Sequence, residues 1–159
     1  MTIKVGDRIP DATLNVLKDG VQAVSTDDIF KGKKVVLFSL PGAFTPTCSA
    51  KHLPGFVQKE AELKAKGVDT ITCLSVNDAF VMNAWGKDQK ADGKVLMLAD
   101  GNGDFTRAVD LEMDGSGYGM GKRSKRYAMV VQDGVVKTLN VENPGAFEVS
   151  SADAILKAL

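Results

Sequence analysis

A largely apolar run over residues 34–40 is the feature that most restricts the fold of this chain. A run of this kind, without regular alternation of polar residues, is typical of a strand covered on both faces of a sheet. It leads directly into the loop PGAFTPTC at residues 41–48, which contains two prolines and ends on a cysteine. The sequence therefore predicts a buried strand that delivers one cysteine to the beginning of the next element.

Helix and strand patterns alternate along the rest of the chain. Pro46 fits the first turn of a helix that continues to Lys66, and Pro54 is expected to kink this helix because it lacks an N–H. The turn at Asp133-Gly134 predicts a hairpin between the last two strands. The remaining predicted elements are strands at 68–76, 95–99, 127–132 and 135–141 and helices at about 78–89, 104–111 and 151–159.

The order of these elements predicts the fold class. Strands separated by helices form parallel α/β sheets, and the final hairpin adds an antiparallel edge. A βαβ unit followed by a ββα unit is the thioredoxin-like arrangement, so we expect a mixed, mostly parallel central sheet flanked by helices. No repeat or long linker interrupts the pattern, and we expect a single domain over residues 1–159.

The charge balance gives no indication of a nucleic-acid or membrane partner. The chain has 20 basic and 20 acidic residues, so no net field favours a polyanion. No apolar stretch approaches the roughly 20 residues that a membrane helix needs, and the first residues lack the apolar core of a signal peptide. We therefore expect a cytoplasmic protein.

The cysteine and histidine content restricts the chemistry. Two cysteines are too few for a disulfide scaffold, and a single histidine without clustered Cys/His spacing predicts neither a metal site nor a cofactor. Cys48 stands in the first turn of a predicted helix, where free N–H groups and the helix dipole favour the nucleophilic thiolate. Thr45 either caps this helix or turns its hydroxyl toward the sulfur, and the two uses are compatible.

The segment PGAFTPTC resembles the Pro-x-x-x-Thr/Ser-x-x-Cys motif of the peroxiredoxins. The resemblance is to the atypical subfamily called peroxiredoxin 5 or type II peroxiredoxin, and it extends over nearly the whole chain. It continues through SVNDAFV at residues 75–81, RSKRYA at 123–128 and VSSADAIL at 149–156.

This resemblance implies a thiol peroxidase that reduces hydrogen peroxide and organic hydroperoxides through a sulfenic acid on Cys48. It also implies that Thr45 and Arg126 hold and polarise the peroxide, with Arg126 ranked above Arg123. From the residues alone, Arg126 is more readily interpreted as a solvated surface charge. The remaining residues expected to contact the substrate are Pro41, Gly42 and Phe44.

His52 and Cys73 are the other candidates near this chemistry. His52 is interpreted as a supporting residue, because a thiolate held by a helix terminus and an arginine needs no general base. Cys73 lies in a predicted strand, where a free cysteine usually behaves as a small buried apolar residue. The resemblance makes it a minor candidate for resolving the sulfenic acid, through a Cys48–Cys73 disulfide reduced by thioredoxin.

A one-cysteine cycle is the preferred prediction for recycling. A disulfide requires Cα atoms within about 7 Å, and a strand cysteine is expected to need local unfolding to meet Cys48. The other arrangement known in the subfamily has a cysteine before the last helix, where this chain has Val149-Ser150-Ser151. We therefore expect glutathione or a glutaredoxin to attack the sulfenic acid.

Two other functions stay open as alternatives. A thioredoxin-like oxidoreductase would carry Cys-x-x-Cys at the helix start, whereas residues 48–51 are CSAK. A redox sensor or binding module on the same fold would have no need of Thr45 and Arg126. The aromatic residues Phe44, Phe80 and Trp85 belong either to the core or to an exposed patch, and with the family's habit of dimerising they favour a homodimer.

Overall fold

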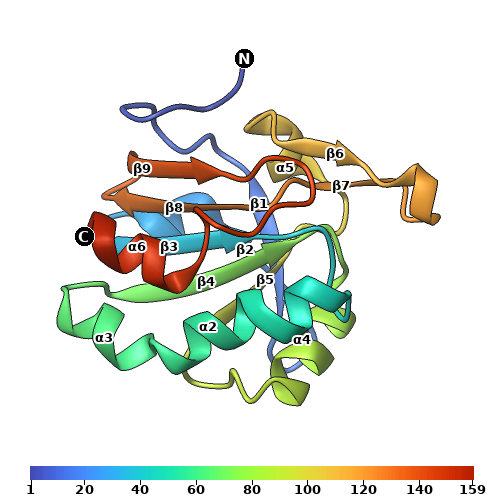
Figure 1. Cartoon of the computed structure of the whole chain (residues 1–159), viewed down its shortest axis with the longest axis horizontal. Helices are drawn as coiled ribbons and strands as arrows, with labels where there is room; N and C mark the ends of the chain where they lie inside the picture. The colour runs from blue at the N-terminus through green and yellow to red at the C-terminus, as the bar shows by residue number, and fades with distance from the viewer.

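The computed structural model describes the whole chain, residues 1–159. A seven-stranded sheet with the order β2-β1-β5-β4-β3-β8-β9 forms its centre, and β6 pairs with β7 in a small second sheet (Figure 1). The strands are β1 (Thr13–Leu17), β2 (Val21–Ser25), β3 (Lys34–Ser39), β4 (Thr70–Ser75), β5 (Leu96–Ala99), β6 (Glu112–Asp114), β7 (Lys122–Ser124), β8 (Tyr127–Gln132) and β9 (Val135–Val141). The helices are α1 (Thr26–Phe30), the π-helical turn η1 (Cys48–His52), α2 (Leu53–Gln58), α3 (Glu60–Ala65), α4 (Ala79–Asp88), α5 (Asp104–Ala108), the short 3-10 turn η2 (Ser116–Tyr118) and α6 (Ala152–Ala158).

The predicted mixed sheet is confirmed, but the expectation that it is mostly parallel is wrong. Only the β3–β4 and β4–β5 pairs are parallel, because the β1–β2 hairpin and the β8–β9 hairpin flank this parallel core and pair with it antiparallel. The apolar run forms β3, which pairs in parallel with β4 on one side and antiparallel with β8 on the other. β4 continues the parallel part of the sheet to β5, and β9 adds the expected hairpin to β8. The predicted thioredoxin-like arrangement of a βαβ unit and a ββα unit is therefore confirmed.

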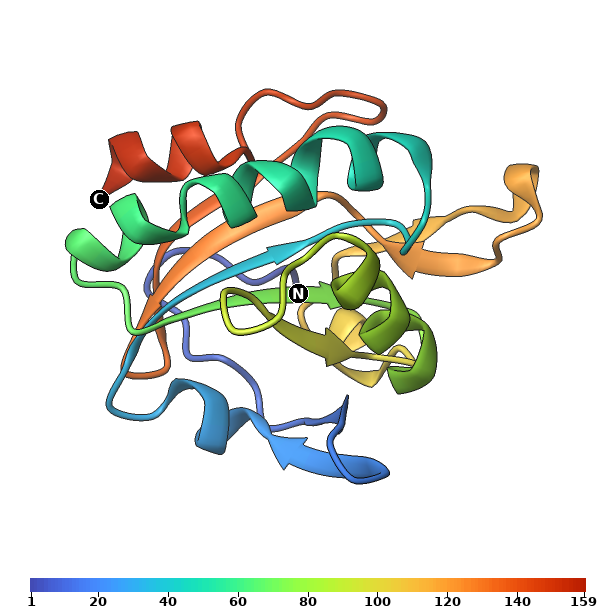
Figure 2. The same cartoon turned by 90° about the horizontal axis from the view of Figure 1, so that it is seen from below.

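The two faces of β3 explain why its sequence is apolar throughout. Val36 and Phe38 pack into a core formed with α2, α3, α4 and α6, whereas Val35 and Leu37 pack into a second core with α1 and α5. Side chains of a strand alternate between the faces of the sheet, so a strand with helices on both faces needs apolar residues at every position. Figure 2 shows these two helical layers on opposite sides of the strands.

The helix predicted from Pro46 to Lys66 is present but divided. Residues 46–47 begin it, the π-helical turn η1 follows, and Lys59 separates α2 from α3. The predicted kink at Pro54 takes the form of this wide turn, in which the N–H of Leu53 donates to the carbonyl of Cys48. A proline inside a regular helix collides with the carbonyl four residues earlier. The widened turn directly before Pro54 interrupts the regular helical hydrogen bonds at this place.

Two segments of the chain fold into elements that the sequence patterns did not predict. The hairpin of β1 and β2 extends the sheet past β5, and α1 follows it. β6 and β7 flank the glycine-rich stretch at residues 115–121, which projects from the body of the molecule (Figure 2). These strands have three to five residues and are mostly half-exposed or exposed, so no apolar periodicity marks them.

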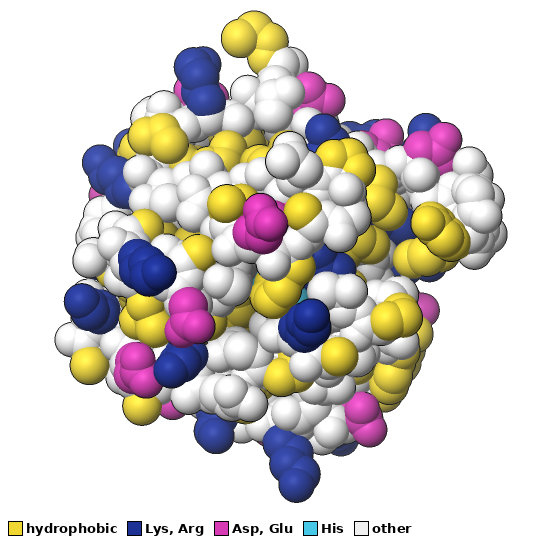
Figure 3. Space-filling view, in the orientation of Figure 1, with side chains coloured by type: hydrophobic (Ala, Val, Ile, Leu, Met, Phe, Trp, Pro, Cys, Tyr) yellow, Lys and Arg dark blue, Asp and Glu magenta, His cyan; other side chains and the backbone are white.

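The surface carries interspersed charges. In Figure 3, basic and acidic side chains alternate over the visible face, and neither sign dominates it. None of the helices combines the length and the apolar character that crossing a membrane requires.

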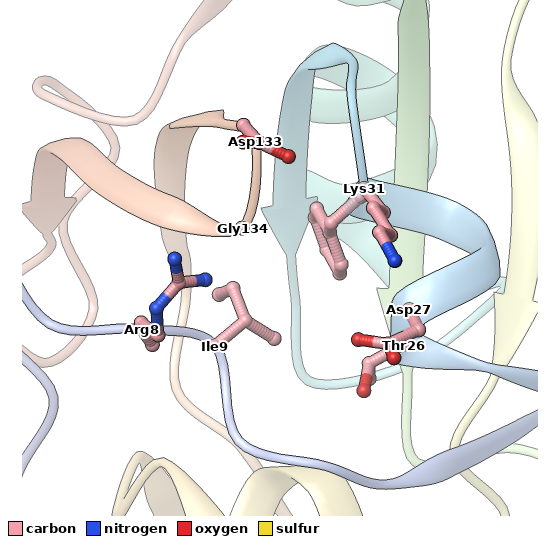
Figure 4. A pocket seen from close by; sticks show the side chains of 8 residues that line it. Arg8, Ile9, Thr26, Asp27, Lys31, Asp133 and Gly134 are labelled. Carbon is pink, nitrogen blue, oxygen red and sulfur yellow. The ribbon is translucent and has the colours of Figure 1, made fainter.

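A polar cavity of about 270 Å³ lies at the end of the sheet opposite to Cys48. It is lined by residues of the N-terminal segment, α1 and the β8–β9 turn, among them Arg8, Lys31 and Asp133 (Figure 4). The register of β3 and β8 separates the two ends, because Lys34 pairs with Gln132 at one end and Ser39 with Tyr127 at the other. The cavity contains none of the predicted site residues.

Candidate active site

Cys48 lies where the carboxyl end of β3 passes into the first helix. Its side chain is fully buried and belongs to the core below α2. The helical backbone begins at Pro46, so the thiol is in the first turn, as predicted. This turn is π-helical, a rare form that is frequent at functional sites.

Thr45 closes the loop that precedes the helix. Its carbonyl accepts the N–H of Ser49 at 2.9 Å, and its hydroxyl donates to the carbonyl of Gly42 at 2.7 Å. The helix cap, one of the two uses expected for this hydroxyl, is not formed, because the hydroxyl is turned back into the loop. This hydrogen bond holds the loop in a tight turn and fixes the Thr45 side chain.

Arg126 joins Cys48 across 78 residues of sequence. Its Nη2 donates to the Cys48 sulfur at 3.2 Å, and its Nη1 donates to Nδ1 of His52 at 2.8 Å. Arg126 directly precedes β8, which lies antiparallel beside β3, so both residues come to the same end of the sheet. A guanidinium offers several donors in a rigid plane, and here it binds two acceptors at once.

His52 is buried and neutral. Its Nε2 donates to the carbonyl of Ser150 at 2.9 Å, which leaves Nδ1 as the acceptor for Arg126. Burial, and then the nearby positive charge of Arg126, lower the pKa of His52 to about 3. Both ring nitrogens are occupied, so His52 supports Arg126 and is not free to take a proton from the thiol.

A model of the Redoxin family matches residues 4–156. The chain belongs to the Redoxin family. It is 52% identical to Peroxiredoxin-2B of Arabidopsis thaliana over 99% of this chain and 98% of that protein. It is also 53% identical to chloroplastic Peroxiredoxin-2E of the same plant, over 99% of this chain and 70% of that protein.

A solved structure is similar to this chain over nearly its whole length. The crystal structure of reduced Prx3 in complex with H₂O₂ from Vibrio vulnificus is similar with a TM-score of 0.95 and 56% identity, over 99% of both chains. The chain is thus a type II peroxiredoxin, a thiol peroxidase, as the motif at residues 41–48 predicted.

Three contacts that the sequence patterns did not predict hold the candidate active-site loop and the helical turn after it in this peroxiredoxin. Asn77 accepts the N–H of Ala43 at 2.9 Å, and Nη1 of Arg123 donates to the carbonyl of Pro41 at 3.4 Å. Asn77 directly precedes Asp78, whose side chain caps α4. No local pattern could have shown that Asn77 reaches a loop 34 residues earlier.

The third contact involves the only tryptophan of the chain. Trp85 is fully buried, and its Nε1 donates to the hydroxyl of Ser49 at 3.0 Å. Of the three aromatic residues considered for an exposed patch, Trp85 is therefore a core residue, while Phe44 and Phe80 are 55% and 62% exposed. Phe44 has a φ of +64°, an unusual conformation for a bulky residue.

Cys73 lies in the middle of β4 and is fully buried in the same core as Cys48. Its neighbours across the sheet are Phe38 of β3 and Met97 of β5. Burial, together with the nearby Cys48, raises the pKa of the Cys73 thiol well above its ordinary value, although Arg126 opposes this. Both cysteines are free thiols in the structure.

Gly42 is a loop position at which a side chain would be crowded by neighbouring side chains. A Cβ there would lie 3.0 Å from Nη1 of Arg123 and 3.3 Å from Cγ2 of Thr45. The absence of a side chain thus allows the loop to pack against both residues. Pro41, Gly42 and Phe44 all belong to this loop, as predicted, and Gly42 is buried.

Proposed function

We propose that Cys48 is the peroxidatic residue of this thiol peroxidase. Its thiolate attacks the terminal oxygen of a hydroperoxide, the O–O bond breaks, and the departing oxygen leaves as water or an alcohol after taking a proton. Cys48 is left as a sulfenic acid. The observation that carries this proposal is the 3.2 Å hydrogen bond from Arg126 to the Cys48 sulfur in a buried turn.

Arg126 and Thr45 are proposed to bind the peroxide. A fixed positive charge beside the sulfur stabilises a thiolate and the negative charge that develops on the leaving oxygen. The Thr45 hydroxyl is held by the Gly42 carbonyl, and it would donate to a peroxide oxygen in place of this carbonyl. Pro41, Gly42 and Phe44 are proposed to form the wall of the entry to Cys48.

Glutathione or a glutaredoxin is the proposed reductant. A resolving thiol must ionise and reach the sulfenic acid, whereas Cys73 is fully buried in a central strand and its pKa is raised. An external thiol does not depend on moving β4, which is paired on both sides. Reduction by thioredoxin through a Cys48–Cys73 disulfide is the alternative, and it requires that strand to open.

A homodimer in the cytoplasm is the proposed assembly and location. Phe44 of the active-site loop and Phe80 of α4 expose large aromatic rings, and aromatic residues are enriched at interfaces.

Rapid mixing of the reduced protein with hydrogen peroxide tests the proposal. We expect wild type to form one sulfenic acid per chain, trapped by dimedone and located by mass spectrometry on Cys48. Cys48→Ser should neither consume peroxide nor be labelled by dimedone. Cys73→Ser should consume peroxide and be labelled on Cys48. Peroxide consumption by Cys48→Ser at the wild-type rate would refute the assignment.

A further inference from the structure

Glu142, the residue that follows β9, has a buried carboxylate with an unusual number of partners. Its Oε2 accepts the backbone N–H groups of Glu148, Val149 and Ser150 at 2.8–2.9 Å and the hydroxyl of Ser150 at 2.7 Å. Desolvation opposes ionisation of this carboxyl, but these hydrogen bonds outweigh it and lower the pKa of Glu142 below its ordinary value. One carboxylate therefore holds the far end of the loop between β9 and α6.

This loop is connected to the thiol by a chain of hydrogen bonds through His52 and Arg126. The carbonyl of Ser150 accepts Nε2–H of His52, and Nδ1 of His52 accepts Nη1–H of Arg126. A neutral histidine donates from one nitrogen and accepts at the other. The position of the Ser150 carbonyl thus selects the tautomer that offers a lone pair to Arg126.

The same loop contacts the arginine in a second way. The ring of Phe147 lies 5.9 Å from the guanidinium carbon of Arg126 and 5.1 Å from the His52 ring. In addition, the backbone N–H of Glu142 donates to the carbonyl of Arg126 at 3.0 Å. The backbone contact is independent of the Glu142 side chain, whereas the placement of Phe147 and Ser150 depends on the carboxylate.

We propose that Glu142 is a positioning residue for the peroxidase reaction. Through Ser150 it fixes the tautomer of His52, and His52 in turn orients the guanidinium of Arg126. The inference rests on the function proposed above for Arg126. Glu142 itself contacts neither the sulfur nor the peroxide, so its effect passes entirely through these neighbours.

The test compares Glu142→Ala and Glu142→Gln with a matched control at Asp100. Asp100 is also a buried carboxylate, and it accepts the N–H groups of Phe105 and Thr106 and the Thr106 hydroxyl. These contacts hold the start of α5, on the other face of the sheet from Cys48. Asp100→Ala therefore removes a comparable set of hydrogen bonds without altering the loop before α6.

The first readout is the second-order rate constant for peroxide with the reduced protein. We expect Glu142→Ala to be slower by about tenfold, as for other small displacements of an orienting group. Glutamine keeps an acceptor oxygen, so Glu142→Gln should recover most of the rate. Asp100→Ala should lower thermal stability but leave the rate constant unchanged.

The second readout is nitrogen NMR of the imidazole, which needs no assignment because His52 is the only histidine. Wild type should show a single tautomer protonated at Nε2 between pH 5 and pH 8. Glu142→Ala should show mixed tautomers or protonation near the ordinary histidine pKa of about 6.5. A merely structural role for Glu142 would not move these resonances in a folded variant.

Ser150→Ala and Ser151→Ala provide a milder pair should Glu142→Ala fail to fold. The first substitution removes one of the four bonds to Glu142, and the second removes the cap of α6. We expect Ser150→Ala to be slower by about two- to threefold, the effect of a weakened hydrogen bond, and Ser151→Ala to match wild type. Equal rates in this pair, or unchanged rate and tautomer in Glu142→Ala, would overturn the inference.

Arg126→Gln separates this inference from the proposed function. If Arg126→Gln reacts as fast as wild type, the proposed role of Arg126 fails. If Arg126→Gln is slow while folded Glu142→Ala keeps the wild-type rate and a single His52 tautomer, only the positioning role of Glu142 fails.

Discussion

Replacement of Arg126 by glutamine is the most direct perturbation of the proposed site. At the 3.2 Å that separates Nη2 from the sulfur, two unit charges in an effective dielectric of about 20 attract each other by about 5 kcal/mol. Arg126 is half-buried, so solvent screens part of this attraction. Glutamine retains a donor but not the charge, and we expect a loss of about 3 kcal/mol in the transition state, or roughly a hundredfold in rate.

Stopped-flow fluorescence can measure this rate without a label. Trp85 is the only tryptophan and is hydrogen-bonded to Ser49, the residue after Cys48, so oxidation of the thiol should change its emission. Arg126→Lys should lose about tenfold, because one ammonium cannot occupy both positions that the guanidinium fills. Arg107→Gln, at an exposed arginine paired with Asp104, is the matched control and should react like wild type. A rate for Arg126→Gln within threefold of wild type would refute the electrostatic reasoning.

Three further results are expected. Cys73→Ser should keep full turnover with glutathione and glutaredoxin in a coupled assay, and loss of that turnover would contradict the one-cysteine cycle. Gly42→Ala should slow the reaction with peroxide by about tenfold while the protein stays folded, since the added methyl group displaces Thr45 or Arg123; an unchanged rate would show that the loop tolerates the shift. The pKa of His52 is about 3 in the folded protein and about 6.5 when unfolded. The unfolded chain thus binds an extra proton below pH 6.5, and urea denaturation should show stability falling from pH 7 to pH 5, with a flatter profile in His52→Gln.

Much of the fold could be predicted because its signals are local. The apolar run at residues 34–40 has no polar face, so it had to become a strand with helices on both sides. The strands and helices after it were marked by periodicity and by turn residues such as Asp133-Gly134. The first hairpin and the β6–β7 pair were missed because strands of three to five half-exposed residues carry no such periodicity.

In the candidate site, too, the local features could be predicted from the sequence and the contacts between distant residues could not. The motif PGAFTPTC identified Cys48 and the loop around it, because the position of a cysteine after a strand and at a helix start is a property of neighbouring residues. The hydroxyl of Thr45 could not be placed from the sequence, since a cap and a bond back to Gly42 use the same atom. The orientation of the Thr45 hydroxyl depends on how the loop packs against Arg123 and Asn77.

The sequence by itself determined that this peroxiredoxin presents a cysteine at the start of a helix after a central strand. Only the tertiary structure decided which residues surround that thiol. Arg126 reaches Cys48 because β8 lies antiparallel beside β3 in the register that pairs Tyr127 with Ser39. His52 becomes neutral because folding buries it between Arg126 and the Ser150 carbonyl. Spacing along the chain encodes local geometry, whereas contacts between distant segments arise from sheet register and burial, which exist only once the chain has folded.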